Sequence, residues 1–372
     1  MKKRKVLILT MSVALGHNVT ANIIENELLK CDINCKKYDI SNSISSFYRI
    51  SYQKSFNQQF SAPKFSRRQY NKFKNKKNRI VNSYYNKLIE SAKTSLLDVI
   101  NEYQPDIIIS THFVSRRFIE KYKNQIAKPF NHYFIVTDYD FTPGVSNGME
   151  NEYIVIPNED FMMDGIHRNF KQEQLLPFGI PCKREFYLDY NKDEIIKNLP
   201  FKLRENQKLI VISGGGNGVG NIDKLAKQLI QNPNNFVVLI TGKNTKILSK
   251  MQKFITKKKI NNLYLTNFVE DYVSLVYSAD LIVGKTGGLT STECIALATP
   301  IISYSNIPSP EYNNLQYLLD KKLCISFSKV KSVGNAIDSA NLEEISNNMK
   351  KYRNSDGLDK LINHIKNCKI NI

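Results

Sequence analysis

The sequence predicts an α/β protein of two doubly wound, Rossmann-like domains, each with a parallel sheet covered by helices on both faces. Three observations predict this class. Short apolar runs rich in β-branched residues alternate with helical stretches along almost the whole chain. These runs are continuously apolar, which is typical of parallel strands that are buried on both faces. Finally, 372 residues exceed what one hydrophobic core usually organises, so two domains are expected.

The apolar runs define the strands that we expect. They cover residues 6–9, 107–110, 132–136, 153–156, 209–212, 236–240, 263–265, 281–283 and 301–304. Helical patterns separate the later runs and cover residues 223–229, 245–256 and 272–277. Strands that alternate with helices in this way form parallel sheets.

The boundary between the domains is expected between Pro181 and Pro200, where a charged helix over residues 192–198 leads into the next strand. The predicted parts are an N-terminal domain, a C-terminal domain and a C-terminal helix that packs back on the first domain. They cover residues 1–188, 189–355 and 356–372. Ligands of such folds lie beyond the carboxyl ends of the strands, so we expect the site in a cleft that the two domains face.

The first apolar run, residues 6–15, has two interpretations. It could be a secretory signal peptide, or a buried strand that leads into a turn and a helix. The strand is favoured, because Gly16-His17-Asn18 follows and then a helical face with Ile23, Ile24, Leu28 and Leu29. The six scattered cysteines are expected to be reduced thiols, which indicates a cytosolic protein.

The charge of the chain is concentrated in one segment. The net charge is +19, and residues 47–94 contain 12 basic residues against the single acid Glu90. Tyrosines and phenylalanines are interleaved with the cations, which favours binding to an anionic membrane surface. A solvated helical insertion is an alternative interpretation. RNA binding is another, although no RNP or KH signature accompanies the segment.

Two glycine-rich loops follow predicted strands and precede predicted helices. The first runs from Ser213 through Gly214-Gly215-Gly216-Asn217-Gly218, and the second runs from Gly284 through Lys285-Thr286-Gly287-Gly288-Leu289-Thr290 to Glu293. Glycine lets the backbone approach a ligand, and a helix N-terminus favours phosphate. Dinucleotide binding is the competing interpretation, but no acid ends the next strand. A third loop, residues 308–314, holds Glu311 and Asn314 at another strand end.

These motifs resemble the family of monogalactosyldiacylglycerol synthases and processive diacylglycerol glucosyltransferases. The likeness spans residues 5–330 in order. It includes Gly16-His17, Thr137-Asp138, the two glycine loops, the stretch Asn267-Phe268-Val269 and the Glu311…Asn314 loop. Ser309 and Pro310 replace the family's Gly and Gln, and Thr286 stands where Pro is common.

The resemblance implies a GT-B fold and inverting transfer of a hexose, glucose or galactose, from a UDP-sugar to diacylglycerol. The reaction would take place at the cytoplasmic membrane face, with no cofactor, no metal and no nucleic acid partner. The donor would be bound by Gly214, Gly215, Gly216, Asn217, Gly218, Phe268, Val269, Thr286, Gly287, Gly288, Leu289, Thr290, Glu293, Glu311 and Asn314. The acceptor and membrane would be met by Arg67, Arg68, Lys72, Lys74, Lys76 and Lys77.

Inverting transfer needs a base for the proton of the acceptor hydroxyl. His17 is the favoured base or acceptor orienter, and Asp138 is either the base itself or the partner that orients His17. His112 is a weaker third candidate. Asp138-Tyr139-Asp140 has the spelling of a metal motif but lies in the acceptor half, so we expect the diphosphate to be stabilised by amides and helix dipoles.

Three other functions remain open from the sequence. A UDP-N-acetylglucosamine transferase acting on another lipid-linked acceptor would share the fold. A hydrolysing UDP-sugar epimerase would share it too, but has no use for a basic aromatic segment. A non-catalytic subunit that binds a sugar nucleotide or recruits a membrane would keep UDP binding without turnover.

Overall fold

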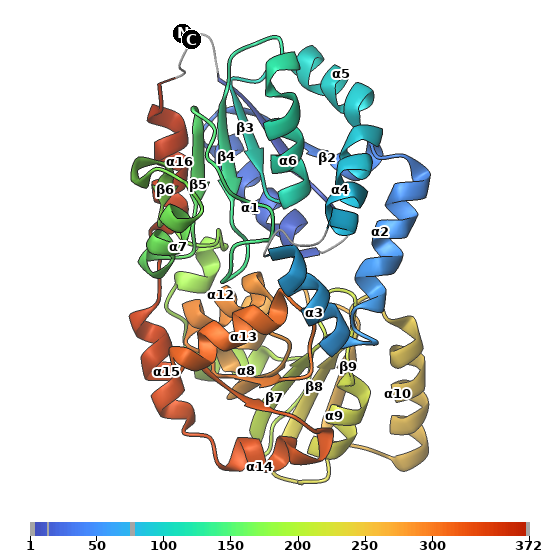
Figure 1. Cartoon of the computed structure of the whole chain (residues 1–372). Helices are drawn as coiled ribbons and strands as arrows, with labels where there is room; N and C mark the ends of the chain where they lie inside the picture. The colour runs from blue at the N-terminus through green and yellow to red at the C-terminus, as the bar shows by residue number, and fades with distance from the viewer. Residues whose placement is uncertain (1–3, 13–14, 75–78, 370–372) are drawn as a thin grey trace. The chain divides into compact units, whose positions relative to one another are not determined.

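The computed structural model describes residues 4–12, 15–74 and 79–369, and it divides into two compact units (Figure 1). The first unit comprises Met1–Cys182 and Asp356–Ile372, and the second comprises Lys183–Ser355. The division falls after Cys182, whereas the sequence analysis placed it after residue 188. The short 3-10 turn Arg184–Tyr187 therefore belongs to the second unit.

In the described part of the first unit, six parallel strands form one sheet in the order β2-β1-β3-β4-β5-β6. The strands are β1 Lys5–Thr10, β2 Asn34–Asp39, β3 Ile107–Ser110, β4 Asn131–Ile135, β5 Glu152–Val155 and β6 Leu175–Leu176. The helices are α1 Leu15–Lys30, α2 Ser46–Gln58, α3 Pro63–Lys74, α4 Arg79–Ser91, α5 Lys93–Tyr103, α6 Phe113–Tyr122, α7 Met162–His167 and α16 Gly357–Asn367. The strand order reverses between β1 and β3, which is the topological switch point of this sheet.

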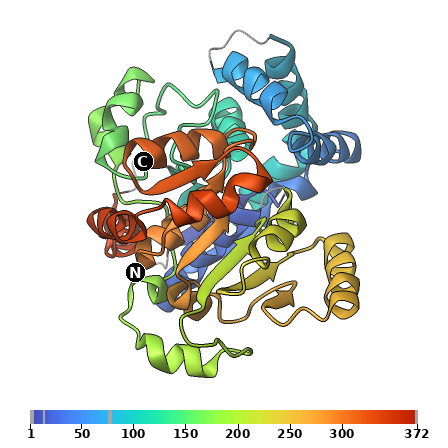
Figure 2. The ribbon, with the colours of Figure 1, turned by 90° about the horizontal axis from the view of Figure 1, so that it is seen from below.

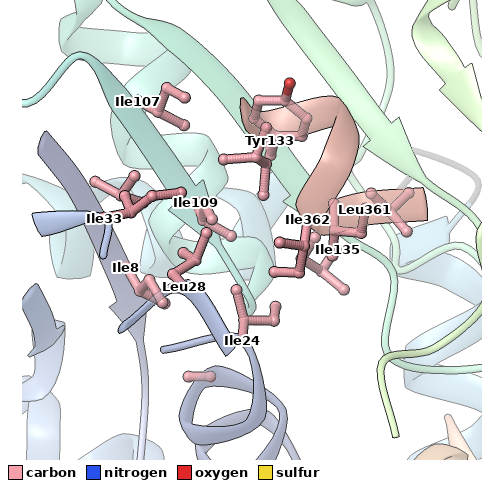
Figure 3. Packing of buried hydrophobic residues seen from close by; sticks show 14 of the residues in the cluster. Ile8, Ile24, Leu28, Ile33, Ile107, Ile109, Tyr133, Ile135, Leu361 and Ile362 are labelled. Carbon is pink, nitrogen blue, oxygen red and sulfur yellow. The ribbon is translucent and has the colours of Figure 1, made fainter. Parts of the chain in front are cut away.

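The C-terminal helix α16 completes the core of the first unit. Leu361 and Ile362 of α16 pack with Ile24 and Leu28 of α1 against one face of the sheet (Figure 3). Backbone carbonyls at the end of α16 accept hydrogen bonds from Arg4, at 2.6 Å for Ile365 and 2.7 Å for Cys368. The last helix is therefore fixed to the first strand both by apolar packing and by a basic side chain at its carboxyl end.

The second unit, all of whose residues are described, has six parallel strands in the order β12-β11-β10-β7-β8-β9. The strands are β7 Lys208–Ser213, β8 Asn235–Ile240, β9 Leu263–Thr266, β10 Leu281–Gly284, β11 Ile301–Tyr304 and β12 Cys324–Phe327. The helices are α8 Lys192–Asn198, α9 Ile222–Leu229, α10 Thr245–Lys258, α11 Tyr272–Ser278, α12 Gly288–Leu297, α13 Glu311–Asp320, α14 Val333–Asp338 and α15 Leu342–Lys351. Here the switch point lies between β7 and β10.

All nine predicted strands are present, and the three that the sequence analysis missed are edge strands. β2 and β6 are the two edges of the first sheet, and β12 is an edge of the second. An edge strand is flanked on one side only, so its sequence carries less apolar signal, as in the polar run of β2. Leu29, expected on the buried face of α1, is 52% exposed, whereas Ile23, Ile24 and Leu28 are buried.

The basic segment forms four helices of the first unit. Helices α2, α3 and α4 are grouped at its periphery in both views (Figures 1 and 2), and α5 packs against β1. Its aromatic residues divide into two sets. Phe73 is buried and stacks on Tyr85, while Phe47 and Phe65 are 73% and 63% exposed. Within the described residues, no helix combines the length and the apolarity required to cross a bilayer.

Candidate active site

Three strand ends of the first unit bring His17 together with two threonines. His17 lies in the first turn of α1, Thr111 follows β3 and Thr137 follows β4. The Nδ1 atom of His17 lies 2.7 Å from the Thr111 carbonyl oxygen and 2.9 Å from the Thr137 hydroxyl. Since β1 and β3 flank the switch point, the imidazole stands where ligands bind in such sheets.

The contact with Thr111 fixes the tautomer of His17. A carbonyl oxygen can only accept a hydrogen bond, so Nδ1 of His17 carries the proton and donates it. The lone pair of the neutral ring is therefore on Nε2. This is the arrangement that a general base needs, with one nitrogen oriented by the protein and the other basic.

His112 has a different role from the one the sequence analysis gave it. Its Nδ1 accepts a hydrogen bond from the Val114 backbone N–H at 3.2 Å and so caps helix α6. Its Nε2 lies 3.4 Å from the Tyr52 hydroxyl. Burial, and secondarily the nearby His17, hold the pKa of His112 well below its ordinary value. The expectation that His112 is a third base is corrected: its basic nitrogen is used for capping.

Asp138 follows Thr137 directly and is half-buried at the same strand end. Helix α3 reaches this loop, because the Tyr70 hydroxyl donates a hydrogen bond to Oδ2 of Asp140 at 3.4 Å. An orienting carboxylate would bind Nδ1 of His17. The Thr111 carbonyl and the Thr137 hydroxyl already contact this atom. Two threonines thus contact Nδ1 of His17, and sequence reasoning did not single them out, whereas the role of Asp138 stays a prediction.

In the second unit, the first glycine loop is folded tightly on its neighbours. Gly218 has a φ of +57°, and a Cβ there would lie 1.9 Å from the Thr241 carbonyl oxygen. A Cβ on Gly214 would lie 2.4 Å from the Val219 carbonyl oxygen. The packing of the loop itself therefore requires these two glycines, and their contact with a donor stays a prediction. Gly215, Gly216 and Asn217 between them are half-exposed.

The second glycine loop gives an open helix N-terminus. Gly287 is the N-cap residue of α12, and a Cβ there would meet no other atom of the described chain within 4 Å, its neighbours aside. The amides of Gly288, Leu289 and Thr290 form the first turn of α12, where the helix supplies no acceptor. Because β10 and β7 are neighbours, this turn and the first glycine loop flank the same switch point.

The loops that follow β10 and β11 are braced by two buried residues. The Thr286 hydroxyl donates a hydrogen bond to the Glu311 carbonyl at 2.8 Å, and Nδ2 of Asn314 donates to the Thr286 carbonyl at 2.9 Å. Both side chains are fully buried. The structure thus gives Thr286 and Asn314, two predicted donor-binding residues, a bracing role between these loops.

A residue that sequence reasoning missed lies beside them. Nζ of Lys285 is 2.8 Å from Oε1 of Glu311, and Cε of Lys285 is 2.9 Å from where a Cβ of Gly215 would stand. One ammonium group therefore reaches from the loop after β10 to both neighbouring loops. Lys285 stands within the second glycine motif, but nothing in the sequence placed it against Gly215.

Phe268 and Val269, two other predicted donor-binding residues, lie in the loop after β9. The Phe268 side chain is 55% exposed, its amide donates to Oδ1 of Asn267 at 2.9 Å, and its carbonyl accepts from the Thr266 hydroxyl at 2.8 Å. Val269 is half-buried. Among the described residues, no group of three or more His, Cys, Asp or Glu side chains could hold a metal ion.

The predicted membrane-binding cations lie mostly on α3. Arg68 and Lys72 are exposed and Arg67 is half-buried. The side chain of Lys74, and Lys76 and Lys77 altogether, lie outside the described residues. Lys64, Arg68 and Lys72 are exposed at a spacing of four residues and so share one face of the helix, with the exposed Phe65 beside them.

Comparisons with known proteins match both units. A family model described as monogalactosyldiacylglycerol (MGDG) synthase matches residues 17–182, and the glycosyltransferase family 28 C-terminal domain matches residues 209–367. The processive diacylglycerol beta-glucosyltransferase of Bacillus licheniformis is 24% identical over 97% of this chain and 94% of its own length. Its counterpart from Bacillus subtilis is 24% identical over 92% of this chain and 88% of its own length.

These matches confirm the predicted resemblance to monogalactosyldiacylglycerol synthases and processive diacylglycerol glucosyltransferases. Solved structures confirm the predicted GT-B fold. MurG of Acinetobacter baumannii matches with a TM-score of 0.60 and 12% identity, covering 98% of this chain and 100% of its own. The glycotransferase of kitacinnamycin matches with a TM-score of 0.64 and 10% identity, covering 98% and 99%. The synthase match begins at His17 and ends at Cys182, where the first unit gives way to the second.

Glu293 of this glycosyltransferase lies in α12, half-buried beside Tyr272. Burial raises the pKa of Glu293 to about 8, against an opposing effect of Lys183. At neutral pH the group is therefore a neutral acid, which can both donate and accept hydrogen bonds. A carboxyl in this state could exchange hydrogen bonds with ligand hydroxyls, and the contact of Glu293 with the donor stays a prediction.

We predict that Glu293→Gln makes stability less dependent on pH. The folded protein holds the Glu293 proton more tightly than the unfolded chain, so the protonated group contributes to the free energy of unfolding. That contribution is present below about pH 4.5 and is lost as pH rises towards 8. Thermal melts between pH 5 and 8 should show a Tm that falls less in the variant, with the variant the more stable at pH 8.

Glu343→Gln is the matched control, because Glu343 is an exposed acid in the first turn of α15. It should keep the wild-type dependence on pH. An equal slope in wild type and Glu293→Gln would contradict the assignment of the buried acid.

Proposed function

We propose that this protein transfers a hexose from a UDP-sugar to diacylglycerol, with inversion at the anomeric carbon, at the cytoplasmic face of a membrane. The observation that carries the proposal is the alignment of nearly the whole chain with enzymes named processive diacylglycerol beta-glucosyltransferases. These names support diacylglycerol as the acceptor and make glucose the first sugar to test. Two structures of the same fold, one described as a complex with UDP and glucose and one as a UDP co-structure, support a UDP-sugar donor.

The geometry of the first unit supports His17 as the base. With Nδ1 held by Thr111 and Thr137, Nε2 would take the proton of the acceptor hydroxyl. The oxygen of that hydroxyl would form a bond to the anomeric carbon on the face opposite the leaving diphosphate. A single displacement of this kind inverts the anomeric centre.

The geometry of the second unit supports binding of the diphosphate without a metal ion. The first-turn amides of α12 and the half-exposed part of the glycine loop flank one switch point, where a helix N-terminus carries about half a positive charge. These groups would stabilise the charge that develops on the leaving diphosphate. We propose that no divalent ion takes part.

The product assay tests this function directly. Wild-type protein is incubated with liposomes that contain diacylglycerol and with UDP-glucose, UDP-galactose or UDP-N-acetylglucosamine. We expect a monohexosyl lipid from one of the first two donors, with an anomeric configuration opposite to that of the donor and with undiminished rate in EDTA. UDP binding without any product would favour a non-catalytic subunit, and absence of UDP binding would refute the proposal.

We predict that His17→Ala lowers kcat by about 100-fold to 10,000-fold, the usual size of an acid–base contribution. UDP affinity should stay near the wild-type value, because His17 lies in the first unit and the glycine loops lie in the second. The measurement is steady-state kinetics together with UDP titration calorimetry. His167→Ala is the matched control, since His167 is exposed in the last turn of α7. Unchanged kcat in His17→Ala would remove this residue from the mechanism.

Replacing Lys64, Arg68 and Lys72 by Gln should weaken binding to vesicles of anionic lipid. Each cation near such a surface contributes about 1 kcal/mol, so the loss should be roughly 100-fold. Vesicle co-sedimentation at low salt measures it, with UDP binding as the check on folding. The same change at Lys246, Lys253 and Lys257, which are exposed on α10, removes equal charge and should have a smaller effect. Equal effects would make the α3 face an ordinary solvated surface.

A further inference from the structure

Lys285 is placed where the loops of three adjacent strands meet. It follows β10, its Nζ lies 2.8 Å from Oε1 of Glu311 beyond β11, and its Cε packs over Gly215 beyond β7. The order β11-β10-β7 makes these strands neighbours. The ammonium group therefore stands at the switch point, beside the first glycine loop and next to the open N-terminus of α12.

Glu311 has one carboxylate oxygen that a ligand could satisfy. The residue is only 5% exposed, and within the described residues its second carboxylate oxygen, Oε2, has no hydrogen-bond partner. A buried carboxylate oxygen without a partner is costly. A hydroxyl group of a bound sugar or ribose would satisfy Oε2, while Oε1 continues to hold Lys285.

We propose that Lys285 is a catalytic residue, the cation that neutralises the leaving diphosphate, and that Glu311 positions it. This inference rests on the proposed function and deepens it. In the step itself, the acceptor oxygen forms a bond to the anomeric carbon and its proton passes to Nε2 of His17. The bond between the anomeric carbon and the β-phosphate oxygen breaks, and its electron pair stays on that oxygen.

The charge balance explains why a lysine is needed as well as the helix. The diphosphate gains one full negative charge as the bond breaks, whereas a helix N-terminus supplies about half a positive charge. The partly buried ammonium of Lys285 adds a second positive group with N–H donors, although Glu311 offsets part of its charge, and the ion pair already holds it in place before the reaction. Lysine binds phosphate as a compact point charge with three N–H donors, so it can follow the diphosphate as its charge grows.

Lys285→Met is the decisive variant, and its kcat should fall by about 100-fold to 1,000-fold, the size found on removal of one group that stabilises developing charge. Lys285→Arg, which keeps the charge, should retain most of the activity. The matched control is Lys250→Met, which breaks the ion pair with Asp223 elsewhere in the same unit. It should leave kcat unchanged.

A second readout separates charge neutralisation from a structural role. Added Mn²⁺ can bind a diphosphate and replace the missing positive charge, so it should restore part of the activity of Lys285→Met. It should not stimulate the wild type. A merely structural loss would lower the Tm and would not respond to the ion. If Lys285→Met does not fold, Lys285→Gln serves the same purpose with a polar side chain.

Two results would overturn the inference. In the first, the kcat of Lys285→Met is within about threefold of the wild-type kcat. In the second, Lys285→Met and Lys285→Arg lose the same activity and Mn²⁺ restores none of it. Those outcomes leave the proposed function intact, because the wild type still makes product. If instead the wild type makes no glycolipid and binds no UDP, the proposed function itself fails. The ratio of the variant kcat to the wild-type kcat thus tests the role of Lys285, whereas product formation and UDP binding by the wild type test the proposed function.

Discussion

The constraint on which this structure depends is the parallel direction of its strands. In a parallel sheet every carboxyl end lies on one edge, so the loops that follow the strands gather there. The strand order reverses between β1 and β3 and between β7 and β10. In folds of this kind, ligands bind at such a reversal, beyond the carboxyl ends of the strands. His17 and Thr111 meet at the first reversal, and Gly215 and Lys285 meet at the second. Each unit therefore gathers its candidate site residues in the same way.

Apolar packing against the sheets fixes the position of these carboxyl edges. In the first unit, α1 and α16 cover one face of the sheet although more than 300 residues separate them in sequence, and α16 is tied to the first strand through Arg4. In the second unit, the hydrophobic core joins β7, β8 and β10 to α9 and α14. A rigid sheet lets a backbone carbonyl such as that of Thr111 act as a fixed acceptor, and that carbonyl decides which nitrogen of His17 is basic.

The segment of basic helices combines two functions of aromatic residues. Phe73 stacks on Tyr85, and Tyr85 contacts Phe113, which lies next to His112, so these rings attach the helices to the edge of the sheet that carries His112. Phe47 and Phe65 remain exposed, and Phe65 lies beside the cations of α3. The aromatic residues of one segment thus form part of the packed interior and part of the exposed surface. An attached helix group with a basic outer face agrees with the proposed function, in which an acceptor lipid would be held close to His17.

The amino-acid pattern predicts the interior strands, the edge strand β9, the two-unit α/β fold, the glycine loops and the position of His17, because continuous burial and tight turns constrain residue type locally. It did not predict β2, whose run is polar, or β6 and β12, which are two and four residues long. The folded chain alone reveals that His112 caps a helix, that threonines contact Nδ1 of His17, and that Lys285 joins Gly215 to Glu311. Each of these depends on a contact between loops far apart in the chain, and the residue types alone do not specify which atoms meet.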